Sequence, residues 1–218
     1  MNTFDFTQAR DLMVEQQIRP WNVLDPRVLE VLGSVPREDY VPQAQRELAY
    51  ADVTLPLAHG EVIMKPVVQG RALEALQVGP EEDVLEIGTG SGYLTDCLSR
   101  MAREVLSIER HADLAEAAQA RLVRQGRANV RVQHADAFGF EPGRQFDAIC
   151  VTGAVTDIPA TFLEWLKPNG RMFIVRGHAP AMEAVLVHQQ VNAPRIESLF
   201  ETHVPYLAGA EPVPAFEL

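Results

Sequence analysis

Residues 83–95 read DVLEIGTGSGYLT, and this stretch decides the fold of the 218-residue chain. The run DVLEI has the composition of a short β-strand. Gly88, Gly90 and Gly92 follow it at alternate positions, immediately before a helix-like stretch. Glycine lets the backbone turn sharply and approach a ligand closely. Glycines also simply turn chains, but three at this spacing between a strand and a helix favour a ligand-binding loop.

Strand-like and helix-like runs alternate after this stretch. The expected strands are 83–87, 104–109, 129–135, 146–153 and 170–175, and the expected helices between them are 95–102, 112–126 and 158–166. This alternation predicts parallel strands with crossovers on both sheet faces. Two late runs, 182–191 and 195–207, have no helix between them and predict an antiparallel edge. The expected fold class is α/β, a doubly wound, mostly parallel, Rossmann-like sheet with an antiparallel C-terminal edge.

The first 80 residues lack the alternation of strand-like and helix-like runs that follows them. Residues 5–18 carry apolar side chains at helical spacing, and Asp25 with Pro26 makes a helix start. Residues 53–66 are mostly apolar but broken by prolines, which predicts an ordered loop before a helix over 67–76. We therefore expect an N-terminal helical lobe with a substrate or lid loop, residues 1–80, packed on a core of residues 81–218 that contains the glycine loop.

Composition argues against several classes of protein. Hydrophobic residues make up 47% of the chain and charged residues 22%, which suits a folded domain. The net charge of −11 disfavours nucleic acid and anionic membranes as partners. Cys97 and Cys150 are expected to be reduced core residues, and no stretch is apolar enough to span a membrane, so the expected location is cytoplasmic. No metal-ligand spacing occurs among His59, His111, His134, His178, His188 and His203.

The glycine loop departs from the dinucleotide fingerprint G-x-G-x-x-G, which needs a glycine where this chain has Tyr93. It resembles instead the acidic-x-Gly-x-Gly-x-Gly loop of S-adenosylmethionine-dependent methyltransferases, with Glu86 as the acid. Glu109 ends a strand about 20 residues after Gly90, the interval at which an acid reaches a ribose hydroxyl. The resemblance implies that Glu109 holds the ribose, that Asp136 lies near the adenine, and that loop amides and Glu86 hold the amino-acid end. The cofactor-binding residues it implies are Glu86, Gly88, Thr89, Gly90, Ser91, Gly92, Glu109, Arg110, Asp136 and Ala137, with S-adenosyl-L-methionine as cofactor and S-adenosyl-L-homocysteine as product.

A closer resemblance extends along the whole chain. Segments 13–42, 49–66, 146–175 and 201–209 resemble, in order, the protein-L-isoaspartate O-methyltransferases. This family repairs damaged proteins by methylating the carboxylate of an isoaspartyl residue. The resemblance implies the same activity, an isoaspartyl protein or peptide as partner, and no nucleic-acid or membrane partner.

The chain departs from this family in the substrate loop. The family reads Gln-Thr-Ile-Ser-x-Pro where residues 61–66 read EVIMKP, so Val62 and Met64 replace two hydroxyls that help orient the target carboxylate. The resemblance places Met64 and Lys65 at the catalytic position, with Lys65 as a replacement carboxylate anchor; a packed methionine and a solvated lysine are the alternatives. We also expect residues 55–66 to cover the cofactor and exclude water. Asp136 lies in Ala-Asp-Ala, where the family prefers glycines.

These departures leave three functions open. The first is carboxyl methylation of isoaspartyl proteins. The second is a methyltransferase of the same fold that acts on another acceptor, such as a small acid or hydroxyl compound suited to a more apolar pocket. The third is a non-catalytic module that binds S-adenosylmethionine and uses the altered loop to contact a partner.

Overall fold

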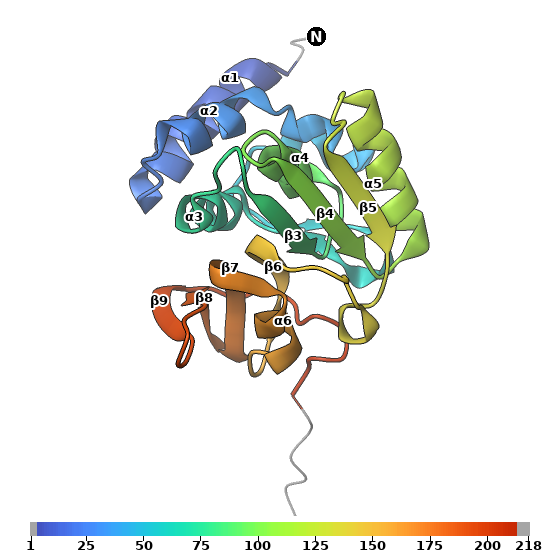
Figure 1. Ribbon diagram of the computed structural model, residues 1–218. Coiled ribbons are helices and arrows are strands. Elements are labelled where there is room, and N and C mark those ends of the chain that lie inside the picture. Colours follow the sequence, from blue (N-terminus) through green and yellow to red (C-terminus); the bar gives the residue numbers. More distant parts are fainter. Residues whose placement is uncertain (1–3, 213–218) are drawn as a thin grey trace, which may run out of the picture.

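The structure is a computed structural model that describes residues 4–212. Its centre is a seven-stranded sheet with the strand order β5-β4-β3-β6-β7-β8-β9 (Figure 1). The strands are β3 (Asp83–Ile87), β4 (Glu104–Glu109), β5 (Val130–His134), β6 (Phe146–Val155), β7 (Leu166–His178), β8 (Ala181–His188) and β9 (Arg195–Glu201). Strands β3 to β7 pair in parallel, whereas β8 pairs antiparallel with both β7 and β9. The predicted doubly wound sheet with an antiparallel edge is confirmed.

The strand order reverses between β3 and β6. Strands β4 and β5 extend the sheet on one side of β3, and β6 and β7 extend it on the other. In open α/β sheets such a reversal leaves a crevice at the carboxyl ends of the strands, where ligands bind. The glycine loop starts at Gly88, directly after β3 ends at Ile87. The fold therefore places the loop at this crevice.

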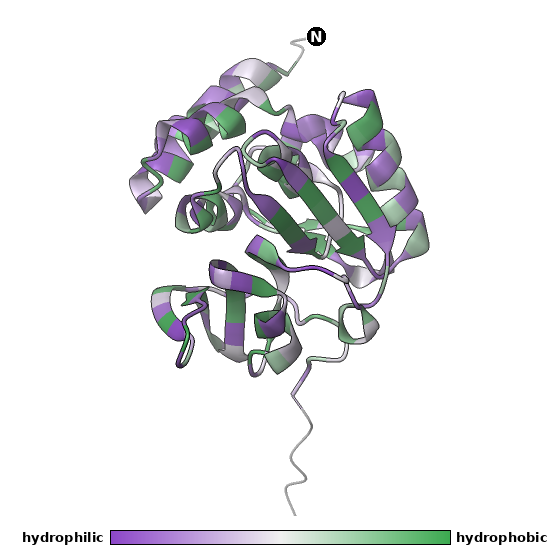
Figure 2. Cartoon of the chain, viewed as in Figure 1, coloured by the Kyte–Doolittle hydropathy of each residue, from purple (hydrophilic) through white to green (hydrophobic). Residues whose placement is uncertain are grey.

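Alternation along the strands divides the core between the two sheet faces. In β3, Val84 belongs to one apolar cluster together with Cys97, whereas Leu85 belongs to a second cluster together with Phe162. The first cluster is covered by helices α3 (Pro66–Leu76), α4 (Tyr93–Ser99) and α5 (Ala112–Arg124), and the second by α6 (Ala160–Glu164). Figure 2 shows mostly apolar residues on β3 and β4 at the centre and polar residues on the outer turns of α1 and α5.

The N-terminal lobe consists of short helices above the sheet (Figure 1). They are α1 (Phe6–Leu12), the π-helix η1 (Met13–Ile18), η2 (Arg19–Trp21), α2 (Pro26–Ser34), η3 (Arg37–Asp39) and η4 (Gln43–Leu48). The expected single helix over 5–18 is thus α-helical only to Leu12. The helix start at Asp25 and Pro26 is confirmed, because the Asp25 carboxylate accepts a 2.8 Å hydrogen bond from the Arg27 backbone N–H.

The predicted loop over 53–66 contains two extended pieces. These are β1 (Leu55–Pro56) and β2 (Val62–Ile63), which pair antiparallel around the short turn η5 (Ala58–Gly60). The Leu57 N–H donates to the Glu61 carbonyl at 2.7 Å and closes the turn. The segment is therefore ordered by its own backbone hydrogen bonds.

Two late elements are shorter than the sequence predicts. Helix α6 ends at Glu164 because Leu166 already pairs with Phe146 in the sheet. Strand β9 ends at Glu201 because the chain then leaves the sheet edge and returns to β6, where the Ala154 N–H donates to the Pro205 carbonyl at 2.8 Å. This return brings residues 205–208 to the carboxyl end of β6.

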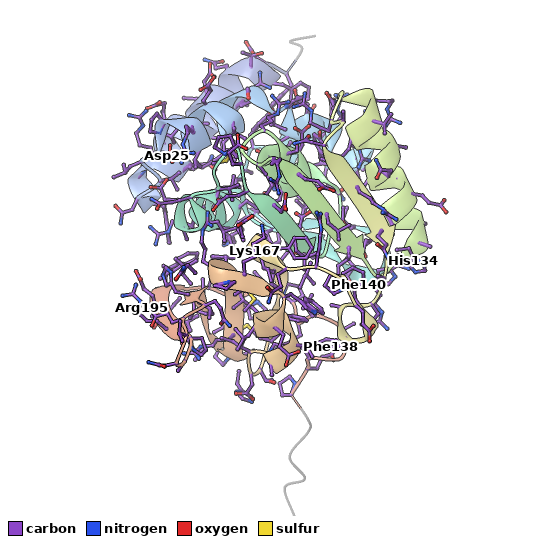
Figure 3. The ribbon with its side chains drawn as sticks, viewed as in Figure 1. Asp25, His134, Phe138, Phe140, Lys167 and Arg195 are labelled. Atoms are coloured by element: carbon purple, nitrogen blue, oxygen red, sulfur yellow. The ribbon has the colours of Figure 1, made fainter. Side chains whose placement is uncertain are left out.

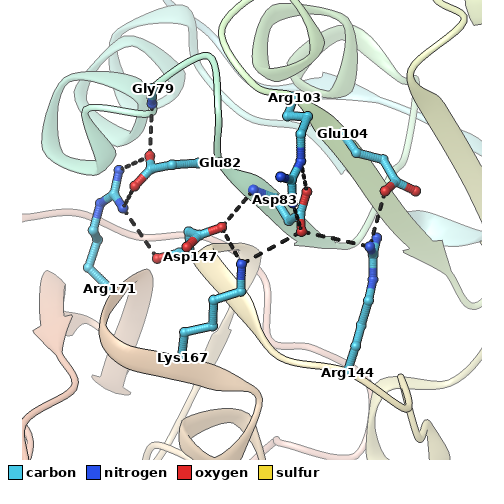
Figure 4. A network of polar contacts seen from close by, with 9 residues as sticks. All are labelled: Gly79, Glu82, Asp83, Arg103, Glu104, Arg144, Asp147, Lys167 and Arg171. Atoms are coloured by element: carbon cyan, nitrogen blue, oxygen red, sulfur yellow. Dashed lines mark hydrogen bonds and ion pairs between the residues drawn. The ribbon is translucent and has the colours of Figure 1, made fainter.

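A charged network joins the amino ends of the central strands, at the edge of the sheet opposite the crevice (Figure 4). Arg171 binds the Glu82 carboxylate through two contacts of 2.6 Å each. Lys167 lies 2.7 Å from the Asp147 carboxylate, which also accepts a 2.8 Å hydrogen bond from the Asp83 backbone N–H. Because the network connects β3, β6 and β7, it contributes to the stability of the sheet.

Both cysteines, Cys97 and Cys150, are free and buried, as the sequence predicts. Burial raises the pKa of the Cys150 thiol well above its usual range, which keeps it protonated. Within residues 4–212, every helix is too short or too polar to cross a lipid bilayer.

Candidate active site

A cleft opens at the crevice where the strand order reverses. Its walls come from the ends of β3, β4 and β6, the loop after β5, the β2 segment and the returning chain at 205–208. The residues that line it are Glu61, Val62, Ile87, Gly88, Gly90, Ile108, Glu109, Arg110, Ala135, Asp136, Ala137, Phe138, Thr152, Gly153, Pro205, Tyr206, Leu207 and Ala208. We call it the outer cleft. Out to its open mouth, solvent space included, it holds about 720 Å³ free of protein atoms.

Two glycines of the loop are required by their surroundings. Gly88 has a φ of 93°, and a Cβ atom there would overlap the Thr152 hydroxyl oxygen. That hydroxyl donates to the Gly88 carbonyl at 2.8 Å. Gly92 has a φ of 84°, and a Cβ atom there would lie 3.3 Å from the Ala118 side chain on α5. Gly88 thus keeps the loop close to β6, whereas Gly92 serves helix packing and does not line the outer cleft.

Glu109 at the end of β4 is bound to the glycine loop. One carboxylate oxygen accepts a 2.8 Å hydrogen bond from the Gly90 backbone N–H, and the other accepts a 3.0 Å bond from the His111 backbone N–H. The side chain is almost fully buried and lines the outer cleft. Each carboxylate oxygen can accept more than one hydrogen bond, so Glu109 keeps acceptor capacity for a ligand in the cleft.

The loop after β5 forms the next wall of the outer cleft. Asp136 begins the short helix η6 (Ala137–Gly139), and its carboxylate accepts a 3.0 Å hydrogen bond from the Phe138 N–H. Its other oxygen lies 3.9 Å from Arg110. Figure 3 shows Phe138 and Phe140 on this loop, below His134 at the end of β5. The sequence-predicted Asp136 and Ala137 therefore lie in this wall, and Arg110, directly after β4, lines the outer cleft beside them.

A smaller cavity lies deeper under the glycine loop. Its lining is Val62, Ile63, Met64, Gln69, Glu86, Gly88, Thr89, Gly90, Ser91, Leu94 and Thr152. We call it the inner pocket. It shares Val62, Gly88, Gly90 and Thr152 with the outer cleft, so one ligand can extend through both.

Glu86 is the acidic group of the inner pocket. Its Oε2 accepts hydrogen bonds from the Thr95 and Ser107 hydroxyls, whereas its Oε1 is buried without a partner in the described structure. Burial raises the pKa of Glu86 to about 7, although the two hydroxyl hydrogen bonds oppose the shift. A cationic group placed at Oε1 would favour the ionised form.

The segment around β1 and β2 lies directly over the glycine loop. A Cβ atom at Gly90 would lie 3.3 Å from Leu57. Side chains hold the segment to the start of α5: His59 binds the Asp113 carboxylate at 2.9 Å, and His111 lies 3.3 Å from the Glu61 carboxylate. The two imidazoles stack with ring centroids 4.2 Å apart. We call this group of four side chains the histidine clasp.

The substrate-loop residues point in two directions. Val62 lines both cavities, and Met64, 4% exposed, lines the inner pocket. Lys65 is exposed and lies outside both cavities, where it borders a surface hollow together with Trp21 and His203. In the structure, Met64 therefore lies beside the glycine loop, whereas Lys65 lies away from it.

Several lining residues have no counterpart in the sequence analysis. Residues 205–208 lie far along the chain from the loop, and Thr152 and Gln69 are isolated polar residues in apolar surroundings. The signals available were the polar position of Thr152 within the otherwise apolar strand AICVTGAV and the family resemblance of residues 201–209, to which no role in the site was given. The remainder depend on tertiary contacts.

Rossmann-like methyltransferases share the parallel sheet, the glycine loop at its switch point and the acid at the end of β4 with dinucleotide-binding proteins, and Tyr93 at the third glycine position of the dinucleotide fingerprint favours the methyltransferase class. The model of the protein-L-isoaspartate(D-aspartate) O-methyltransferase family matches residues 8–209. The chain belongs to this family.

Individual relatives agree with the family match. The protein-L-isoaspartate O-methyltransferase of Myxococcus xanthus is 41% identical over 192 residues, which cover 86% of this chain and 91% of the relative. Protein-L-isoaspartate O-methyltransferase 1 of Rhodopseudomonas palustris is 38% identical over 209 residues, covering 94% and 85%. A Plasmodium falciparum protein described as a protein-L-isoaspartate O-methyltransferase, crystallised with S-adenosyl-L-homocysteine, shares the fold with a TM-score of 0.80 at 21% identity, over 91% of this chain and 97% of that chain.

Proposed function

We propose that this protein transfers a methyl group from S-adenosyl-L-methionine to the carboxylate of an isoaspartyl residue in a damaged protein or peptide. The observation that carries the proposal is the position of residues 62–64. In the family this segment orients the target carboxylate, and here it borders the same inner pocket as the glycine loop. Because both cysteines are free and buried, we also propose a cytoplasmic location.

The described residues fit this cofactor. Glu109 is the proposed acceptor for the ribose hydroxyls, since it retains acceptor capacity beside Gly90. The wall that contains Asp136 and Ala137 is the proposed adenine side. Glu86 is the proposed partner of the ammonium group, because its Oε1 is buried and unpaired in the described structure. When bound, S-adenosyl-L-methionine supplies a methyl group already activated by a sulfonium.

The work left to the protein is positioning. An isoaspartyl carboxylate is ionised at neutral pH, so the acceptor needs no general base. Holding the reacting groups at the correct distance, with water excluded, supplies most of the rate gain in such a displacement. The buried Met64 and the partly buried Val62 form an apolar wall suited to excluding water.

The same wall supports a second candidate function. Val62 and Met64 offer no hydroxyl to a carboxylate, and the lost contacts are worth on the order of a kcal/mol each. An acceptor that is less polar than an isoaspartyl side chain would suit this surface better. The second candidate is therefore a methyltransferase of the same fold with a different acceptor.

Lys65 has a separate place in the proposal. It is exposed beside Trp21 and His203, outside the cavities. We propose that Lys65 contacts the acceptor peptide on either side of the isoaspartyl residue. Lys65→Ala is then expected to raise KM for the peptide while leaving cofactor affinity unchanged.

The test of the proposed function is transfer of labelled methyl groups. One isoaspartyl peptide, its normal aspartyl counterpart and a metabolite extract are each incubated with the protein and labelled cofactor. Label on the isoaspartyl peptide alone supports repair, and label only in the extract supports the second candidate. Absence of label in all three, with cofactor still bound, contradicts both.

A further inference from the structure

Arg37 is a fully buried cation beside the inner pocket. It begins η3, is 0% exposed, and donates from Nη2 to the Met64 carbonyl at 2.8 Å and from Nη1 to the Gln69 side-chain oxygen. The Tyr93 ring lies 4.6 Å below the guanidinium. Within the described part of the chain, no carboxylate pairs with Arg37, and its Nε is unpaired. A buried charge without a counter-ion is costly, which points to an anion supplied from outside the protein.

Gln69 connects this cation to the inner pocket. An arginine only donates hydrogen bonds, so the Gln69 atom that faces Arg37 must be the oxygen. The orientation of the amide is thereby fixed, and the Nε2 group is left on the other side. Gln69 is 3% exposed and lines the inner pocket, and among the described residues the one side-chain hydrogen bond of Gln69 is that from Arg37 to its oxygen. The pocket therefore contains a positioned donor without an acceptor.

Glu86 supplies the complementary group in the same pocket. Its Oε1 is a buried acceptor without a donor, because the Thr95 and Ser107 hydroxyls both bind Oε2. A ligand that satisfies Gln69 and Glu86 together must present a hydrogen-bond acceptor to the first and a donor to the second, and the buried charge of Arg37 behind Gln69 favours an anion as the acceptor. An α-amino acid, with its carboxylate and ammonium on one carbon, has this combination.

We propose that Gln69, held and polarised by Arg37, binds the α-carboxylate of the cofactor's amino-acid end. The inference rests on the proposed function, since it concerns the same cofactor. The bound carboxylate would then be the anion closest to Arg37, from which it is separated only by the Gln69 amide. Gln69 is then a cofactor-binding residue and Arg37 a positioning residue. The arrangement selects ligands that carry a free carboxylate at this end.

The test is a comparison of three ligands by calorimetry. S-adenosyl-L-homocysteine has the complete amino-acid end, S-adenosyl-3-thiopropylamine lacks only the carboxylate, and 5′-methylthioadenosine lacks the whole end. Gln69→Leu is expected to weaken binding of the first ligand roughly 10- to 100-fold, the range for a lost hydrogen bond to a charged group, and to leave the other two unchanged. Retained binding of methylthioadenosine also shows that the variant is folded.

Two further variants sharpen the comparison. Gln69→Glu keeps an acceptor for Arg37 but places a negative charge at the pocket, so it should weaken homocysteine-ligand binding more than Gln69→Leu does. Gln17→Leu is the matched control, because Gln17 is partly buried and donates to the Tyr50 carbonyl away from both cavities. It should leave the affinities for all three ligands unchanged.

The outcomes separate this inference from the proposed function. Equal losses for all three ligands, or unchanged affinity for S-adenosyl-L-homocysteine, would overturn the role of Gln69. Unchanged cofactor affinity with a raised KM for isoaspartyl peptide would assign Gln69 to the acceptor instead, and this too overturns the inference. If the unmodified protein binds none of the ligands, the proposed function fails and the inference falls with it.

Discussion

The Glu109 carboxylate accepts a 2.8 Å hydrogen bond from the backbone N–H of Gly90, so a side chain of β4 holds the loop that follows β3. The acid expected from the sequence as a ligand contact therefore also supports the loop. Replacing it removes both contributions at once.

Glu109→Ala is expected to lower the affinity for S-adenosyl-L-homocysteine by about tenfold to a hundredfold. The variant loses a charge-assisted contact, worth roughly 1.5–3 kcal/mol, and leaves the Gly90 N–H unpaired. Titration calorimetry measures the change. Glu116→Ala on the exposed side of α5 is the control and should bind normally. Equal affinity in the two variants would remove Glu109 from the cofactor site.

Restoring hydroxyls to the inner pocket is expected to speed methylation of isoaspartyl peptides. The double substitution Val62→Thr with Met64→Ser returns two hydrogen-bonding groups beside the glycine loop. If both bonds form mainly in the transition state, kcat/KM rises roughly tenfold to a hundredfold. Val62→Ala with Met64→Ala changes size without adding hydroxyls and is the control. An unmodified protein that is already as fast as the hydroxyl variant would show that Met64 is compatible with repair.

Glu86→Gln is expected to be more stable than the unmodified protein, and this gain in stability should be larger at pH 8 than at pH 5. Burial raises the folded-state pKa of Glu86 to about 7, above the value of 4.5 for a free glutamate. Between these values the folded state binds the proton more tightly, so the contribution of Glu86 to stability falls as the pH rises, and it is lowest above pH 7. Glutamine does not titrate.

Urea unfolding at both pH values checks this prediction. The stability difference between Glu86→Gln and the unmodified protein should grow by about 3 kcal/mol from pH 5 to pH 8. Glu81→Gln, at an exposed position, provides the baseline. A difference that is the same at both pH values would mean that Glu86 titrates normally in the folded protein.

Arg171→Met is expected to destabilise the fold by about 2–4 kcal/mol. Arg171 is largely buried, and its loss leaves Glu82 without its bidentate partner (Figure 4). Burial alone would raise the pKa of Glu82, but the Arg171 hydrogen bonds hold it below its usual value. Arg195→Met removes a solvent-exposed pair with Glu197 and should cost less than about 1 kcal/mol. Similar unfolding midpoints in urea for both variants would contradict this ranking.

Asp113→Asn is expected to loosen the histidine clasp and speed ligand release. The Asp113 carboxylate binds His59, which holds the β1–β2 segment over the glycine loop. Because the pair is solvent-exposed, we expect a change of only about two- to fivefold in the dissociation rate of S-adenosyl-L-homocysteine. Stopped-flow measurements resolve this, with Glu116→Gln as the control. A dissociation rate that does not change would show that the clasp does not limit release.

Local pattern was sufficient for the sheet and for the loop. Gly88, Gly90 and Gly92 follow the strand DVLEI directly, so the sequence alone could place a ligand-binding loop at the end of this strand. Glu109 was expected from its place at the end of a strand about 20 residues after Gly90, and the parallel pairing of β3 and β4 brings it beside the glycine loop. These features depend on neighbours in sequence or on a regular sheet geometry.

The rest of the site depends on contacts that no local pattern records. Lys65 and Met64 are adjacent in sequence, yet Lys65 is exposed outside both cavities and Met64 lines the inner pocket. The proposed binding role of Gln69 depends on its hydrogen bond with Arg37, which lies 32 residues earlier in the chain. The wall at 205–208 exists because the chain turns back from β9 to pair with Ala154.

That late return has a consequence for the order in which the protein is made. During translation the glycine loop emerges from the ribosome well before Pro205, Tyr206, Leu207 and Ala208. A nascent chain that already contains the loop still lacks one side of the outer cleft. The complete cleft can therefore assemble only after residues 205–208 have been made, and a chain cut short before Pro205 would be made with an open-sided site.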